Sequence, residues 1–273
     1  MRNAKGTLLG HTIGQVGIEG VPSWNFIHQR SLIKHPDYNI GDYVDLPNGK
    51  RFRYGRSGGA VGGLARAAIN GNVIPGDTNG SGYEGSLVSA VAAGKNIVVL
   101  TDTASAANRP VDYYAGGTFV AFIATHYLSF GITKSTVGNG TSITITLDAA
   151  LTADCSASVG VTAYPSIYGK IMAASAVLQN VETFIGVPAC PNVAATLTYF
   201  WVQTRGPLWI TAHGGTWPGA STALRDVYFH IDGTIDPATI MDVGTLAPQR
   251  AGYLLHSGST GSYGDGVIML QLE

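Results

Sequence analysis

The sequence contains few charged residues of either sign. Lys, Arg, Asp and Glu make up 12% of its 273 residues, about half of the roughly 25% usual in globular proteins, and the net charge is −1. Such a chain has no strong field that would attract nucleic acid or an anionic membrane surface. Because much of its surface must be uncharged, we expect the protein to bury surface in an assembly.

Cysteines and long apolar runs are also scarce. Cys155 and Cys190 are too few for a disulfide scaffold and neither belongs to a C-x-x-C pair, so we expect two buried free thiols in preference to a disulfide. The best apolar stretch, residues 117–125, is half of the roughly 18 residues that a membrane helix needs. The first twenty residues lack the apolar run of a secretory signal. We therefore expect no membrane partner.

Glycine and strand-forming residues are abundant. The 37 glycines lack the three-residue period of collagen and indicate many tight turns. Runs of β-branched and aromatic residues recur between clusters of Gly, Pro, Ser and Asp. The clearest runs are residues 96–101, 118–125, 141–148, 197–203, 226–231, 252–255 and 267–272. Their spacing predicts an all-β fold that is mainly antiparallel and sandwich-like or barrel-like.

The run at 141–147 also predicts which side chains face the core. Hydroxyl and aliphatic residues alternate there, so one face of a half-buried strand should carry Ile143, Ile145 and Leu147.

The chain shows weak signals for helices and for domain boundaries. Alanine-rich residues 87–93 predict a short helix, and residues 104–107 predict a weaker second one. Residues 1–40 have no sustained hydrophobic period, which predicts an extended N-terminal arm that needs a partner. We expect residues 41–273 to form the β-rich domain, with room for two subdomains whose boundary the sequence does not show.

Residues 43–56 give the clearest local pattern. Two strand-like stretches flank Pro47-Asn48-Gly49, which predicts a hairpin with a type I′ turn, because Asn-Gly readily adopts positive φ. The cations of this region are Lys50, Arg51, Arg53 and Arg56, followed by Arg66. The interleaved Phe52 and Tyr54 would suit nucleic acid. In a nearly neutral chain we favour pairing of these cations with acidic side chains of another subunit.

Motifs for catalysis or cofactor binding are weak. The match to G-x-G-x-x-G at residues 80–85 follows a loop-like stretch where a dinucleotide site requires a strand, so we favour a surface loop there. No G-K-[ST] motif occurs. His230 and Asp232 could share a metal ion, but one pair supplies too few ligands, and we expect a local hydrogen bond between them. These patterns predict no enzymatic activity, no cofactor and no metal.

Several segments together resemble a known family. They are YVDLPNGKRFRYGRSGGA at 43–60, YFWVQTRGP at 199–207, RAGYLL at 250–255 and IMLQL at 268–272, with the weaker IGVP at 185–188. In this order they resemble head-associated proteins of tailed bacteriophages, which are similar to capsid decoration or cement proteins. The resemblance spans residues 40–273.

The resemblance implies a non-enzymatic structural virion protein. It would be made in the host cytoplasm and would stabilise the outside of the capsid as a cement protein, with the major capsid protein and its own copies, in a homotrimer, as partners. The N-terminal arm would clasp the shell. The candidate contact residues are Lys50, Arg51, Arg53, Arg56, Trp201 and Arg205.

An alternative function remains open at this stage. The chain would then be a tail or head-fibre component that contacts the host surface or its glycans. Trp201, Trp209 and Trp217 would serve as exposed platforms for sugars.

Overall fold

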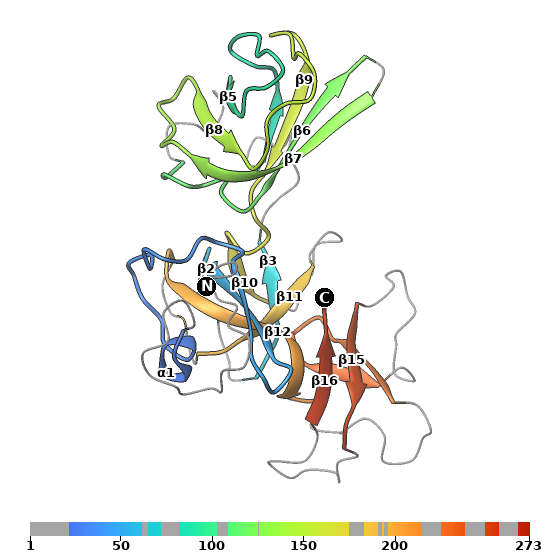
Figure 1. Ribbon diagram of the computed structural model, residues 1–273. Helices are drawn as coiled ribbons and strands as arrows, with labels where there is room; N and C mark the ends of the chain where they lie inside the picture. Colours follow the sequence, from blue (N-terminus) through green and yellow to red (C-terminus); the bar gives the residue numbers. More distant parts are fainter. Residues whose placement is uncertain are drawn as a thin grey trace. The chain divides into compact units, whose positions relative to one another are not determined.

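The computed structural model describes residues 22–61, 65–71, 82–102, 109–124, 126–174, 183–190, 193, 196–213, 225–237, 249–256 and 267–273. In these residues the chain is nearly all antiparallel β-sheet with one short helix, which confirms the predicted all-β class (Figure 1). The chain divides into two compact units. Unit 1 comprises residues 1–38, 42–71 and 170–273, and unit 2 comprises residues 39–41 and 72–169.

The described part of unit 1 contains a ten-stranded sheet. Its strands are β1 (Tyr43–Asp45), β2 (Arg51–Arg56), β3 (Ala68–Asn70), β10 (Ile171–Ala173), β11 (Phe184–Pro188), β12 (Tyr199–Trp209), β13 (Asp226–Phe229), β14 (Ile235–Pro237), β15 (Arg250–Leu254) and β16 (Val267–Gln271). The main order is β10-β3-β11-β12-β16-β15-β13-β14, and β2 pairs with both β1 and β12. The long strand β12 is central, because it pairs with β11, β2 and β16.

The described part of unit 2 contains a six-stranded sheet in the order β4-β9-β6-β7-β8-β5. The strands are β4 (Tyr83–Gly85), β5 (Ile97–Leu100), β6 (Thr118–Ile123), β7 (His126–Ser135), β8 (Ile143–Leu147) and β9 (Gly160–Tyr164). An antiparallel bridge between Leu87 and Leu100 joins the region just after β4 to β5, so the two ends of the sheet approach each other. The sheet therefore curls into a barrel-like form around a mainly aliphatic core.

Unit 2 is inserted into a β-hairpin of unit 1. Strands β3 and β10 pair antiparallel, with Asn70 opposite Ile171, and the backbone N–H of Gly71 donates to the carbonyl of Lys170 at 2.8 Å. Nearly all of unit 2 lies between these two strands in the sequence. An entire domain thus takes the place of a hairpin turn, which explains why no linker was visible in the sequence.

Residues 22–38 fold against the unit 1 sheet. Ser23 caps the four-residue helix α1 (Trp24–Ile27) by accepting a hydrogen bond from the backbone N–H of Phe26. Ile27 is fully buried, and Ser31 pairs with Tyr199 through two backbone hydrogen bonds. The prediction of an extended arm is therefore wrong for residues 22–38, because their apolar side chains complete a core of unit 1. Residues 1–21 lie outside the described residues.

Two further local predictions need correction. Residues 87–93 form no helix; the backbone N–H of Val88 donates to Val99 and that of Val91 to Cys155, so pairing with neighbouring strands outweighs alanine propensity. Residues 104–107 lie outside the described residues.

The hairpin at 43–56 is confirmed, but only Gly49 of its loop has positive φ. With Pro47 holding negative φ, the loop is a three-residue one and not a type I′ turn.

Other details of the sequence analysis are confirmed. In β8 the side chains of Ile143, Ile145 and Leu147 are buried and the threonines between them are half-buried. Cys155 and Cys190 are both buried and free. No helix in the described ranges is both long and apolar enough to span a membrane.

Candidate functional site

The two arginines on the outward face of β2 are paired within the chain. Arg51 donates to both carboxylate oxygens of Asp45, at 2.7 and 2.9 Å, and also contacts Glu273 at 3.2 Å. Arg53 donates twice to Glu273, each time at 2.8 Å. Both guanidinium groups lie over the ring of Tyr43, 4.7 and 4.9 Å from its centre. The acidic partners expected on another subunit are therefore present in the same chain.

The sheet register explains these pairs. Asp45 is the cross-strand neighbour of Arg51 in the β1–β2 hairpin. Glu273 follows β16, which continues along the same edge of β12 as β2, so its carboxylate reaches both arginines. The hydrogen bonds from Arg51 to Asp45 raise the pKa of the guanidinium above its ordinary value, and those to Glu273 add to this. Arg51 therefore stays charged and hydrogen-bonded to Asp45 and Glu273.

The remaining cationic candidates do not join one contact surface. Lys50 is half-buried with Nζ 5.8 Å from the ring centre of Trp24, and burial lowers the pKa of its ammonium group. Arg56 is only 5% exposed. Arg205 is the cross-strand neighbour of Arg51, is exposed, and forms no ion pair with a residue that the structure describes. Of these three, Arg205 has the exposure that a contact residue requires.

Trp201 lies in an aromatic core and not on the surface. Its side chain is 0% exposed, and its ring centre is 5.1 Å from those of Tyr38 and Tyr54 and 6.4 Å from that of Phe26. A sugar platform needs an accessible ring face, so Trp201 cannot provide one. Trp209 is half-buried, and Trp217 lies outside the described residues.

A small cavity lies beside this aromatic core. Its volume is about 60 Å³, and its lining includes Arg30, Tyr54 and Trp201. Water occupies about 30 Å³ per molecule in the liquid, whereas small-molecule sites usually measure about 300 to 1,000 Å³. The cavity therefore suits a few waters and not a cofactor.

Strand β6 exposes an uncharged surface in unit 2. Phe119 and Ala121 face the core, whereas Phe122 is 52% exposed and lies opposite Tyr127, which is 69% exposed. Tyr164 of β9 extends this surface and is 42% exposed. We call it the β6 face; it consists of Thr118, Val120, Phe122, Tyr127, Ser129 and Tyr164, whereas Thr162 of β9 is only 7% exposed and does not belong to it.

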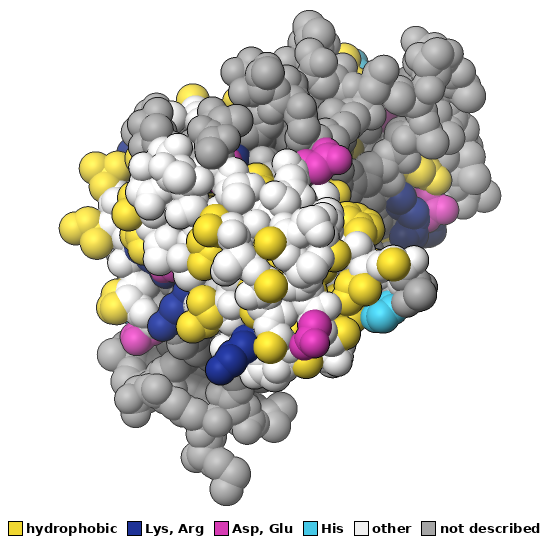
Figure 2. Space-filling view, turned by 90° about the horizontal axis from the view of Figure 1, so that it is seen from above, with side chains coloured by type: hydrophobic (Ala, Val, Ile, Leu, Met, Phe, Trp, Pro, Cys, Tyr) yellow, Lys and Arg dark blue, Asp and Glu magenta, His cyan; other side chains and the backbone are white. Residues whose placement is uncertain are grey.

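The residues of the β6 face combine aromatic rings with hydroxyl groups and are themselves uncharged, and the exposed carboxylate of Glu84, the cross-strand neighbour of Thr162, borders them. Figure 2 shows one side of the molecule, where yellow hydrophobic side chains are spread among white uncharged ones, with a few dark-blue and magenta charged side chains between them. Large exposed apolar side chains that gather on one sheet face are typical of contact surfaces. Sequence reasoning missed this surface because its residues come from three strands.

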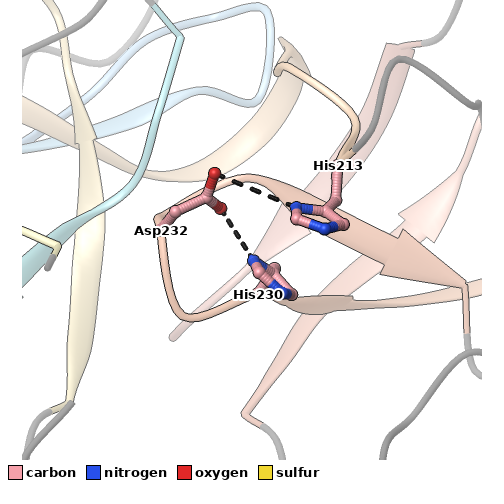
Figure 3. A group of neighbouring side chains, drawn as sticks. All are labelled: His213, His230 and Asp232. Atoms are coloured by element: carbon pink, nitrogen blue, oxygen red, sulfur yellow. Dashed lines mark hydrogen bonds and ion pairs between the residues drawn. The ribbon is translucent and has the colours of Figure 1, made fainter. Parts of the chain in front are cut away.

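A third candidate site combines His213, His230 and Asp232 (Figure 3). His230 Nδ1 lies 2.9 Å from Asp232 Oδ1, and His213 Nδ1 lies 3.9 Å from Asp232 Oδ2. The two imidazole rings stack with centres 3.5 Å apart. The predicted local hydrogen bond between His230 and Asp232 is confirmed, but no sequence pattern predicted that His213 joins them.

Pairing between segments brings His213 to this place. Asp232 lies in the turn between β13 and β14, and the chain just after β12 runs beside β14 through a bridge between Ala212 and Ile235. The backbone N–H of Ile235 donates to the carbonyl of Thr211 at 3.1 Å. His213 therefore projects next to the β13–β14 turn.

Hydrogen bonds hold the Asp232 carboxylate in its charged form. Burial alone raises its pKa, but bonds from Thr234 and His230 outweigh this and lower the pKa to about 2. Asp236 behaves differently, because burial raises its pKa while His213 and His230 oppose that rise. Arg66 lies 3.4 Å from Asp232 Oδ2 and completes the charged surroundings.

A buried ion pair in unit 2 was also missed by sequence reasoning. Arg109 Nε lies 2.7 Å from Asp102 Oδ2, and the two side chains are only 4% and 3% exposed. Tyr114 donates its hydroxyl to the same oxygen at 3.1 Å, and Arg109 donates to the carbonyl of Gly82 at 3.0 Å. The site is enclosed, so it stabilises unit 2 and offers no access to a substrate.

The glycine motif at 80–85 gives no support for dinucleotide binding. Residues 80 and 81 lie outside the described residues, and residues 83–85 form strand β4, whereas the fingerprint requires a helix to start there.

Comparisons with protein-family models, with curated proteins and with solved structures found no match to this chain.

Proposed function

We propose that this chain is a non-enzymatic virion protein that binds the outside of a bacteriophage capsid and stabilises it as a decoration or cement protein. The resemblance of its segments at 43–60, 199–207, 250–255 and 268–272 to head-associated phage proteins supports the class. The observation that carries the proposal is the β6 face, an uncharged surface with three exposed aromatic side chains on a rigid sheet.

Binding in this proposal requires no chemistry. The β6 face would lie against the major capsid protein, and neighbouring contacts, each burying more than about 1,000 Å², would bridge capsid subunits. Because a partner that binds only the closed shell stabilises that state, the shell would open only after these contacts break. A homotrimer would present three β6 faces to a local threefold axis.

The internal arginine pairs change which residues carry the contact. Arg51 and Arg53 have carboxylate partners within the chain, so recruiting them to a capsid would first require breaking those pairs. Burial of the aromatic side chains of the β6 face therefore replaces the arginines of β2 as the proposed source of affinity. Arg205 of unit 1 is a separate exposed cation.

The first test is the copy number of the chain in density-purified virions, measured against the major capsid protein by quantitative mass spectrometry. A decoration protein should be present in hundreds of copies, near an integer ratio to capsid subunits. A few dozen copies would instead favour the tail or head-fibre alternative, and absence from virions would overturn both.

A second test addresses the β6 face itself. Changing Phe122→Ser together with Tyr127→Ser should weaken co-sedimentation with capsids by at least about 10-fold, since central aromatic contacts are usually worth about 2 kcal/mol or more. The matched control is Val111→Ser with Val137→Ser, two side chains of unit 2 that are 64% and 61% exposed but lie outside the face. Equal loss in both variants would show that the β6 face is not the contact.

A further inference from the structure

The cluster of His213, His230 and Asp232 has the composition of a transition-metal site. Their ligand atoms all lie within 4.8 Å of one another. Two imidazoles and one carboxylate are a donor set that suits Zn²⁺ and its first-row neighbours, whereas Mg²⁺ and Ca²⁺ prefer oxygen ligands alone. The cluster therefore discriminates between classes of cation by its chemistry.

The distances are compatible with one shared ion. Ligands on a tetrahedral Zn²⁺ lie about 2.0 to 2.2 Å from the metal, which places them roughly 3.3 to 3.6 Å from one another. His230 and Asp232 already lie within that separation, at 2.9 Å, and His213 lies 3.9 Å from the carboxylate. The side chain of His213 is 43% exposed, so a small rotation suffices to bring it closer.

The positions of the donors on the backbone favour a rigid site. Asp232 is held by its turn, where its carboxylate accepts from the backbone N–H of Thr234 at 3.1 Å and from the hydroxyl of the same residue. The bridge between Ala212 and Ile235 fixes the segment that carries His213. Two of the donors, Asp232 and His213, therefore come from segments whose backbone is already held in place. This lowers the conformational entropy that would be lost when a metal ion binds.

The charged neighbours of the cluster should have opposite effects on the binding of a metal ion. Asp236 lies close enough to interact electrostatically with both imidazoles and would favour a bound cation. Arg66, whose side chain is 46% exposed, lies 3.4 Å from Asp232 Oδ2 and competes for that oxygen. The competition distinguishes a metal site from a purely structural hydrogen-bond cluster, because removing Arg66 should improve metal binding.

We propose that His213, His230 and Asp232 bind one divalent transition-metal ion of the Zn²⁺ class, which ties the end of β12 to the β13–β14 turn. The site lies within unit 1 and needs no part of the β6 face. It is therefore independent of the proposed role in capsid binding.

The test uses the full chain, stripped with a chelator and titrated with Co²⁺, whose visible absorption reports nitrogen and oxygen ligands. We expect absorption that saturates at one equivalent and is displaced by Zn²⁺ but not by Mg²⁺. His213→Ala and Asp232→Asn should each weaken binding by at least about 10-fold, and Arg66→Ala should tighten it. Circular dichroism of each variant checks that the fold is retained.

His126→Ala is the matched control, because His126 is an exposed histidine of unit 2 outside the cluster. It should bind Co²⁺ as the unchanged chain does. The proposal is overturned if the unchanged chain shows no saturable absorption, or if His213→Ala binds equally well. Failure of Asp232→Asn to weaken binding would also overturn it, since Asp232 would then not be a ligand.

Discussion

The two units use ion pairs in opposite ways. In unit 1, Arg51 and Arg53 meet Asp45 and Glu273 at the surface, where the four side chains are between 20% and 41% exposed. In unit 2, Arg109 and Asp102 meet at 4% and 3% exposure. Exposed pairs typically contribute about 0 to 1 kcal/mol, whereas breaking a buried pair costs several times more. Breaking the buried pair of unit 2 should therefore cost much more stability than breaking a surface pair of unit 1, although both are pairs of an arginine and a carboxylate.

The surroundings of each pair show the same difference. The unit 2 pair is enclosed by Tyr113 and Tyr114, whose ring centres lie 4.6 and 5.0 Å from the guanidinium carbon of Arg109. The Tyr114 hydroxyl and the Gly82 carbonyl satisfy further polar groups. The surface arginines of unit 1 need no such enclosure because water solvates them. Burial therefore determines how many partners a charge requires.

The two units also differ in aromatic content, which makes them separately observable. The four tryptophans of the sequence, at positions 24, 201, 209 and 217, all belong to unit 1. Unit 2 contains tyrosines, including Tyr83 and Tyr114 in its core, but no tryptophan. Tryptophan fluorescence therefore follows unit 1, and circular dichroism follows both units.

The largest expected effect comes from breaking the buried pair. Arg109→Leu leaves the Asp102 carboxylate without its cation, which should lower the stability of unit 2 by about 3 to 5 kcal/mol. Circular dichroism during urea unfolding should reveal an earlier transition, while the tryptophan transition of unit 1 moves little.

The double change Asp102→Leu with Arg109→Leu provides the control. It removes both charges, so it should be less destabilising than Arg109→Leu alone. An equal or larger loss would show that packing and not the charge is responsible. A tryptophan transition that shifts as far as that of unit 2 would show that the units unfold together.

A smaller effect concerns the aromatic core of unit 1 at alkaline pH. Burial, assisted by the charges of Asp37 and Asp42, raises the pKa of Tyr38 from 10.0 to about 12. The unfolded chain then loses this proton at lower pH than the folded chain. The contribution of Tyr38 is fully present below pH 10 and declines by about 2 kcal/mol as pH rises to 12.

Tyr38→Phe isolates this contribution. Its free energy of unfolding, followed by tryptophan fluorescence in urea, should fall less steeply between pH 10 and 12 than that of the unchanged chain. Identical slopes would mean that the Tyr38 hydroxyl titrates normally in the folded protein.

Patterns within a strand were predictable from the sequence, and pairings between distant segments were not. The alternation in β8 and the β1–β2 hairpin follow from neighbouring residues. His213 lies beside His230, seventeen residues away in sequence (230 − 213), because of the bridge between Ala212 and Ile235. Glu273 reaches Arg53 across 220 residues. The helix α1 was predictable in part, because serine, here Ser23, is a favoured N-cap residue.

The smallest expected effect concerns the surface pairs whose partner the sequence did not reveal. Glu273→Gln removes the charge that Arg51 and Arg53 share, yet it should cost unit 1 less than about 1 kcal/mol, because water and Asp45 continue to solvate the cations. The loss should shrink further at high salt, since salt screens exposed charges. Urea unfolding followed by tryptophan fluorescence measures it, with Glu84→Gln, an exposed carboxylate of unit 2, as control. A loss of several kcal/mol that persists in high salt would mean that this pair behaves like the buried pair of unit 2, and the contrast between the units would fail.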